Sequence, residues 1–113
     1  MPGAINMGVC PITLNASGAV VPLRFVTALG AQTGVGANAI GVAAQPAANA
    51  EPFTADVLGV VSVEVGAAVT AGGLAQSDAS GRAIDRVAGA ILGRFLDGAT
   101  AAGQLARLAL IPN

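Results

Sequence analysis

Short apolar runs, separated by turn-forming residues at intervals of about 8 to 12 residues, recur along the whole chain. The clearest run spans residues 60–65, where valines at alternate positions are interleaved with Ser62 and Glu64. β-branched residues in alternation with polar ones are typical of a strand that is buried on one face. These features predict an all-β fold, a small barrel or sandwich of short strands joined by glycine-rich loops.

Further strands are expected on both sides of this run, at residues 9–14, 19–29, 40–44, 53–65, 74–76, 82–87, 88–96 and 104–111. Residues 53–65 indicate either two strands or one strand bent at Gly59. Pro22 cannot donate to a ladder, so the segment 19–29 is predicted to lie at a sheet edge or to contain a bulge.

Three connections carry recognisable turn signals. Asp97 and Gly98 are typical of a hairpin turn, and residues 99–102 allow a helical turn before the last strand. Residues 77–81 predict a turn in which Asp78 bonds its own backbone. The stretch GVGANAIG at 34–41 has only a superficial likeness to a phosphate-binding loop, because Ala39 replaces its third glycine and a strand follows. It predicts a flexible or contact loop.

Charged residues make up only 10% of the chain, against about 25% in an average protein. A free domain needs more charge than this on its surface, so the composition predicts a surface covered by other copies or by a partner, or a membrane protein. The longest uncharged run is broken by polar residues and glycines, which argues against a membrane span. No basic residue precedes Arg24, so no secretory signal is expected and the chain is predicted to be produced in the cytoplasm.

The side chains that usually carry chemistry are scarce. The chain has no histidine to act as a base for Cys10, its single cysteine, which is predicted to pack as a small apolar side chain. The spacing of the acids matches no metal loop, and the absence of lysine excludes a biotin or lipoate carrier. We therefore expect no enzyme activity, no metal and no cofactor.

The basic residues are five scattered arginines and the aromatic residues are three phenylalanines, which does not suit binding of nucleic acid. Arginine without lysine is instead typical of protein interfaces. Arg82, Asp85 and Arg86 indicate either a polar outer face or intersubunit contacts.

The order of several short segments resembles the capsid decoration, or cement, proteins of tailed phages, akin to the lambda head decoration protein. The segments are GVA, GVVSV, VTAG, DASGR and ILGRFLDG, at 41–43, 59–63, 69–72, 78–82 and 91–98. The resemblance covers roughly residues 19 to 111, and it is carried by the ordered set rather than by any one segment.

This resemblance implies a β-clip-like fold that forms a homotrimer. Such a trimer binds the major capsid protein at three-fold and quasi-three-fold sites on the outer surface of an expanded icosahedral capsid and stabilises it. The resemblance also implies an N-terminal arm at residues 1–10 before a single β domain at 11–113. In that arm Pro2, Ile5, Met7 and Val9 are the predicted capsid-binding residues, and alternation of the last three suits addition of a strand to a sheet edge.

Two other interpretations stay open at this point. The arm can equally be a frayed terminus without a role before binding. The whole chain can be a ligand- or sugar-binding β module, such as the base of a head fibre, although sugar recognition usually uses the exposed aromatic rings of tryptophan and tyrosine, which this chain lacks.

Overall fold

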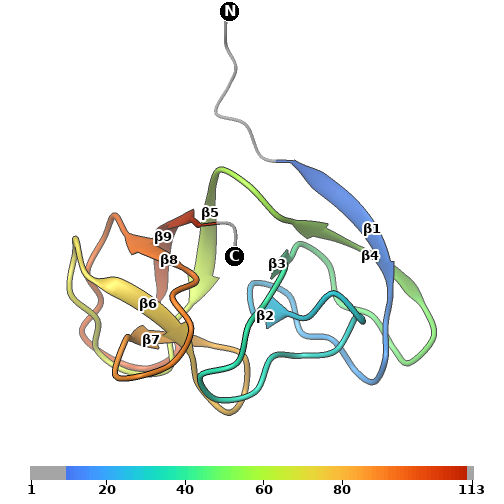
Figure 1. Ribbon diagram of the computed structural model, residues 1–113, viewed down its shortest axis with the longest axis horizontal. Coiled ribbons are helices and arrows are strands. Elements are labelled where there is room, and N and C mark those ends of the chain that lie inside the picture. The colour runs from blue at the N-terminus through green and yellow to red at the C-terminus, as the bar shows by residue number, and fades with distance from the viewer. Residues whose placement is uncertain (1–9, 112–113) are drawn as a thin grey trace, which may run out of the picture.

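A computed structural model of the chain describes residues 10–111 (Figure 1). These residues form nine strands and no helix, which confirms the predicted all-β class. The strands are β1 (Pro11–Asn15), β2 (Phe25–Val26), β3 (Gly41–Ala43), β4 (Pro52–Asp56), β5 (Val60–Glu64), β6 (Leu74–Ser77), β7 (Ala83–Asp85), β8 (Gly93–Phe95) and β9 (Leu105–Leu110). Over the same range no helix has the length and hydropathy needed to cross a membrane.

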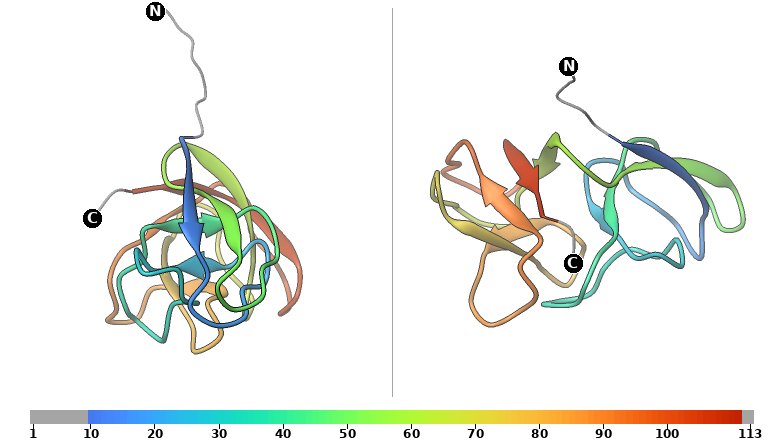
Figure 2. Two further views of the ribbon diagram at one scale, coloured as in Figure 1. Left: turned by 90° about the vertical axis from the view of Figure 1, so that its right-hand side faces the viewer. Right: turned by 45° about the horizontal axis from the view of Figure 1, so that its top comes forward.

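The strands form two antiparallel sheets that lie side by side as two lobes (Figures 1 and 2). The first has the order β1-β4-β3-β2, and we call it the sheet lobe. The second has the order β5-β9-β8-β6-β7, and we call it the barrel lobe, because a parallel bridge from Val65 to Ala83 connects its two outer strands. The N–H of Gly66 also donates to the carbonyl of Ala83 at 2.9 Å. The expected small barrel is thus present in one half of the chain.

The chain passes from the sheet lobe to the barrel lobe between β4 and β5. Gly59 lies in this crossing with a φ of 99°, a left-handed conformation that glycine adopts without steric cost. Of the two alternatives for residues 53–65, the structure therefore has two strands, and they belong to different sheets.

The buried side chains form two clusters, and one of them joins the lobes. One lies inside the sheet lobe around Val26 and Phe53. The other fills the barrel lobe around Phe95, and it also includes Phe25 and Val42 from strands β2 and β3. Because these two side chains of the sheet lobe pack into the core of the barrel lobe, the lobes are joined by apolar packing. The predicted domain boundary after residue 10 stays a prediction.

The segment 19–29 was expected to be one strand, and this expectation is wrong for most of its length. Only Phe25 and Val26 form a strand, while Val20 makes an isolated bridge to Ala47. Pro22 and Leu23 turn the chain between them, and Leu23 has a φ of 65°. The predicted edge position is confirmed, since β2 is the last strand of its sheet.

The connection after β8 also differs from the expectation. Strands β8 and β9 pair as antiparallel neighbours, but the chain between them runs from residue 96 to residue 104 rather than turning tightly at Asp97 and Gly98. Ala99 in this connection pairs with Val69 instead, which draws the loop away from a two-residue turn. The predicted closing strand is confirmed as β9.

Candidate assembly surfaces

The acids and the cysteine of the chain lie apart from one another. Within residues 10–111 no group of three or more cysteine, aspartate or glutamate side chains is placed to hold a metal ion. Cys10 is exposed, which corrects the prediction that it packs as a buried apolar side chain. Its backbone extends the β1 ladder, with its N–H donating to the carbonyl of Leu58 at 3.2 Å and its carbonyl accepting from Val57 at 3.0 Å. Cys10 therefore lies at the outer end of an edge strand, where little covers its side chain.

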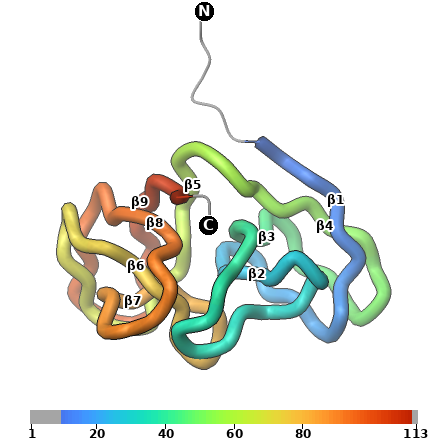
Figure 3. The backbone as a smooth tube through the Cα atoms, in the orientation of Figure 1, coloured from blue at the N-terminus to red at the C-terminus, as the bar shows by residue number. Residues whose placement is uncertain are grey.

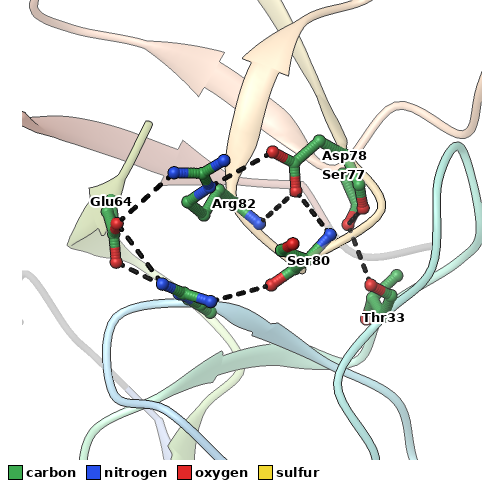
Figure 4. Close-up of polar contacts among 7 residues, drawn as sticks. Thr33, Glu64, Ser77, Asp78, Ser80 and Arg82 are labelled. Carbon is green, nitrogen blue, oxygen red and sulfur yellow. Dashed lines mark hydrogen bonds and ion pairs between the residues drawn. The ribbon is translucent and has the colours of Figure 1, made fainter. Parts of the chain in front are cut away.

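A polar network joins the two lobes (Figure 4). Glu64 at the end of β5 accepts a hydrogen bond from Nε of Arg24 at 3.1 Å and pairs with Nη1 of Arg82 at 3.8 Å. Arg82 in turn pairs with Asp78 at 3.3 Å. The side chains are 18–29% exposed, so solvent screens them only in part. Because Arg24 precedes β2 and the other three belong to the barrel lobe, this network helps to set how the lobes are oriented.

The turn at residues 77–81 brings its backbone into the same network. Oδ1 of Asp78 accepts from the N–H groups of Ser80 and Arg82 at 2.8 and 2.9 Å, which confirms the predicted capping role. The hydroxyl of Ser77 donates to the carbonyl of Thr33 at 3.3 Å, so the turn also reaches the loop of the sheet lobe.

That glycine-rich loop, residues 30–39, joins β2 to β3 and on its way extends to the barrel lobe (Figure 3). Gly36 donates its N–H to the carbonyl of Ser77 at 2.9 Å and accepts from the N–H of Ala90 at 3.0 Å. A side chain on Gly89 would collide with the Cα of Gly36, so glycine is needed where the two backbones touch. The loop thus has the contact role, the second of the two alternatives in the sequence prediction.

The three predicted intersubunit residues lie at the two ends of β7. Arg82 precedes the strand and is held in the network between the lobes. Asp85 and Arg86 lie at the other end, beside an open depression of about 320 Å³ that Thr70, Gly73 and Leu74 also line. Asp85 accepts from the N–H of Thr70 at 3.2 Å. The two arginines therefore lie at opposite ends of the strand, and the intersubunit role of all three residues stays a prediction.

A row of side chains crosses the outer face of the barrel lobe beside this depression. Leu74 on β6 pairs with Arg94 on β8, and on its other side its carbonyl accepts from the N–H of Arg86 at 2.8 Å. We call Arg86, Leu74 and Arg94 the arginine row. Both guanidinium groups are exposed and bond only carbonyl oxygens, Gly89 at 2.8 Å and Gly72 at 2.7 Å. Two cations that flank an apolar side chain can bind a surface that is partly apolar and partly acidic.

A buried glutamine shapes the loop that follows Arg86. Gln76 is only 4% exposed, and its Oε1 accepts from the successive N–H groups of Val87, Ala88 and Gly89 at 2.9, 3.2 and 2.9 Å. Three converging amides hold the side-chain oxygen in place. This contact fixes the course of the loop and with it the position of Arg86.

The sheet lobe carries an acid, Asp56, that differs from the acids of the polar network. Asp56 at the end of β4 lies opposite Pro11 on one side and the buried Val42 on the other. Within residues 10–111 its carboxylate takes part in no ion pair and no side-chain hydrogen bond. Burial by its neighbours raises the pKa of Asp56 above its ordinary value, because desolvation disfavours the charged form.

The opposite case is Asp97 in the barrel lobe. Arg107 bonds it through Nε at 2.9 Å and Nη2 at 3.0 Å. The hydrogen bonds from the Arg107 side chain and backbone lower the pKa of Asp97 to about 2. This exposed pair already satisfies both charges within the chain.

Strand β1 is an edge strand of the sheet lobe. The N–H of Cys10 and that of Ala16 both donate across to the β4 side, to Leu58 and Glu51. Because ladder bonds alternate along an antiparallel strand, the N–H groups of Thr13 and Asn15 point away from β4. The predicted arm residues Pro2, Ile5, Met7 and Val9 come before this strand and lie outside the described residues.

Comparisons with known proteins were made for the chain as a whole. A family model described as phage cement protein matches residues 6–110. Among solved structures, the head fibre gp8.5 N base of bacteriophage phi29 is similar, with a TM-score of 0.76 and 16% sequence identity. The similarity covers 92% of this chain and 95% of that one, so the two proteins share a fold across both lobes. No curated protein sequence matches.

Proposed function

Since the chain belongs to the phage cement protein family, and is thus a structural component of the virion, we propose that it binds and stabilises the expanded icosahedral capsid of a tailed phage. In this proposal homotrimers, assembled in the host cytoplasm, occupy three-fold and quasi-three-fold sites on the outer surface. Each trimer contacts neighbouring copies of the major capsid protein. The observation that carries the proposal is the family match over residues 6–110, which includes every strand of both lobes.

The composition of the surface supports this proposal. Leu29, Val35 and Val87 are 83%, 67% and 81% exposed, and only 10% of the chain is charged. Apolar groups at the surface cost free energy in water, and that cost disappears when assembly covers them. A protein whose surface is partly covered by other subunits of the virion needs fewer charged side chains than a free protein does.

We propose that the arm and the edge of β1 form the contact with the capsid. The N–H groups of Thr13 and Asn15 point away from β4 and can extend the sheet, and the arm leads directly into this strand. Ile5, Met7 and Val9 would then place their side chains on one face of the added strand.

The test is to mix the purified chain with expanded capsids that lack it. We expect saturable binding and a higher temperature of capsid rupture, and images of the particle should show three-fold density over the outer surface. A variant in which Ile5, Met7 and Val9 are replaced by serine should keep the circular dichroism spectrum of the parent and lose most of the binding. If the parent shows no saturable binding, the proposal is wrong.

The base of a head fibre is a second candidate, favoured by the fold shared with the phi29 fibre base. Images of the particle separate the two, because a fibre base carries density that projects beyond the two lobes. A sugar-binding role has less support. Phe25, Phe53 and Phe95 are the only aromatic residues of the chain, and each is no more than 2% exposed, so no ring is available for stacking.

A further inference from the structure

We propose that copies of this chain associate head to tail, with the arginine row of the barrel lobe of one copy placed against Asp56 on the sheet lobe of the next. The inference deepens the proposed homotrimer and rests on it for the number of copies. The contact joins two different surfaces of the chain, and the charges that meet there are those of Arg86, Arg94 and Asp56.

The distribution of charges within the chain is the first argument. In residues 10–111, three arginines form ion pairs, Arg24 and Arg82 with the network at Glu64 and Arg107 with Asp97. The cations left without a carboxylate in this range are Arg86 and Arg94, and both lie on the barrel lobe.

Three acids have no ion pair within residues 10–111, and two of them lie on the sheet lobe. These two are Asp56 and Glu51, and Glu51 accepts from the N–H of Ala48 in its own turn at 2.8 Å. The third, Asp85, accepts from Thr70. Unpaired cations therefore lie on one lobe, while Asp56, which has no side-chain hydrogen bond in the described range, lies on the other. Opposite charges on different lobes suit a contact between two different copies.

The state of Asp56 is the second argument. Its side chain is half-buried beside Pro11 and Val42, yet no residue between 10 and 111 donates a hydrogen bond to it in compensation for the lost hydration. A partly desolvated carboxylate without a partner costs free energy, and a guanidinium from outside would remove that cost. Burial raises the pKa of Asp56, which agrees with this description of its surroundings.

The surroundings of Arg94 are the third argument. On its own sheet Arg94 stands between Leu74 and Ala109, and Val60 follows Ala109 on the next strand. Leu74 and Ala109 are half-buried and Val60 is 42% exposed, so Arg94 projects from a stretch of the sheet whose neighbouring side chains are apolar and can be covered by a partner. An arginine set in an apolar surrounding is typical of the centre of a protein interface.

The geometry of the two surfaces sets the kind of assembly. A contact between different surfaces of identical chains repeats from copy to copy, and it ends only when the copies close into a ring. A specific interface covers about 800 Å² on each partner, so two such faces would cover roughly 1,600 Å² of each copy. The accessible surface of the chain is 5286 Å², which leaves ample room for a capsid contact as well.

The test is an exchange of charges between the two surfaces. The mass of the free protein is measured by analytical ultracentrifugation for the parent, for Asp56→Arg, for Arg94→Asp and for the double variant. We expect a trimer for the parent, association at least about tenfold weaker for each single variant, and recovery in the double variant. Glu51→Arg is the matched control, because it makes the same change at an exposed acid of the same lobe and should leave the trimer intact.

Several results would overturn the inference. They are a monomeric parent, single variants that associate like the parent, or a double variant no better than the single ones. Arg86→Asp combined with Asp56→Arg is a second pair, for the case that Arg94→Asp does not fold. Capsid binding is measured separately. A parent that binds capsids as a monomer refutes this inference and the trimer, but not the capsid-binding function. A trimer that does not bind capsids refutes the proposed function and leaves this inference standing.

Discussion

Replacing Gln76 by alanine should destabilise the protein more than its single side-chain oxygen suggests. That oxygen accepts three backbone hydrogen bonds, from Val87, Ala88 and Gly89, two of them at 2.9 Å. Alanine removes the acceptor and leaves a cavity behind a loop that carries Arg86. We expect the loop to lose its fixed course, while the strands keep their pairing.

The magnitude follows from the number of bonds. A neutral hydrogen bond contributes about 1 kcal/mol to stability, and an amide left without a partner costs more, up to about 3 kcal/mol where water cannot reach it. Val87 and Ala88 are exposed, so water can replace part of what is lost. The expected loss is therefore about 3 kcal/mol. With an unfolding entropy of about 2.1 cal/mol/K per residue, this lowers the melting temperature of a 113-residue chain by roughly 13 °C.

The assay is thermal unfolding followed by circular dichroism, supported by amide exchange of residues 87–89. Gln45→Ala is the matched control, because Gln45 is exposed and accepts one long bond of 3.4 Å from Thr54. Gln76→Glu should keep most of the stability at neutral pH, since a carboxylate also accepts these bonds. If Gln76→Ala melts within a degree or two of Gln45→Ala, the three bonds do not hold the loop.

Three further outcomes can be measured by the same unfolding experiment. Gly89→Ala should cost about 1–3 kcal/mol because the added Cβ meets the backbone of the facing loop, whereas Gly34→Ala, with nothing within 4 Å, should be close to neutral. The contribution of Asp97 to stability is present above its ordinary pKa of 3.8 and is lost as the pH falls through about 2. Arg107→Gln should abolish this loss of stability at low pH. If the variant and the parent lose stability equally over this range, the assignment to the Asp97–Arg107 pair is wrong. Phe25→Ala should cost about 3–5 kcal/mol, because its buried ring joins the two lobes, and a smaller loss would mean that the lobes do not depend on this packing.

Local pattern was enough to predict the class of the fold and most of its strands. The alternate valines at 61, 63 and 65 face the core of the barrel lobe, as their spacing predicts. The side chain of Asp78 accepts a hydrogen bond from the backbone of its own turn, which is also the predicted contact. These features depend on neighbours within a few residues, which is the range over which side-chain alternation and turn chemistry act. The segment 19–29 was misread because its apolar residues resemble a strand, while Pro22 and Leu23 form a turn that tertiary contacts hold.

The candidate surfaces show the limit of this reasoning. Arg82 and Arg86 are close in sequence, but β7 separates them, and one lies between the lobes while the other faces outward. The strand neighbours of Arg94 and of Asp56 could not be predicted, because they depend on which strands of distant sequence lie side by side. Alternation along a chain determines which face of a strand is apolar. Only the folded sheet determines which charge stands next to which, because pairing across strands joins residues that the sequence keeps far apart.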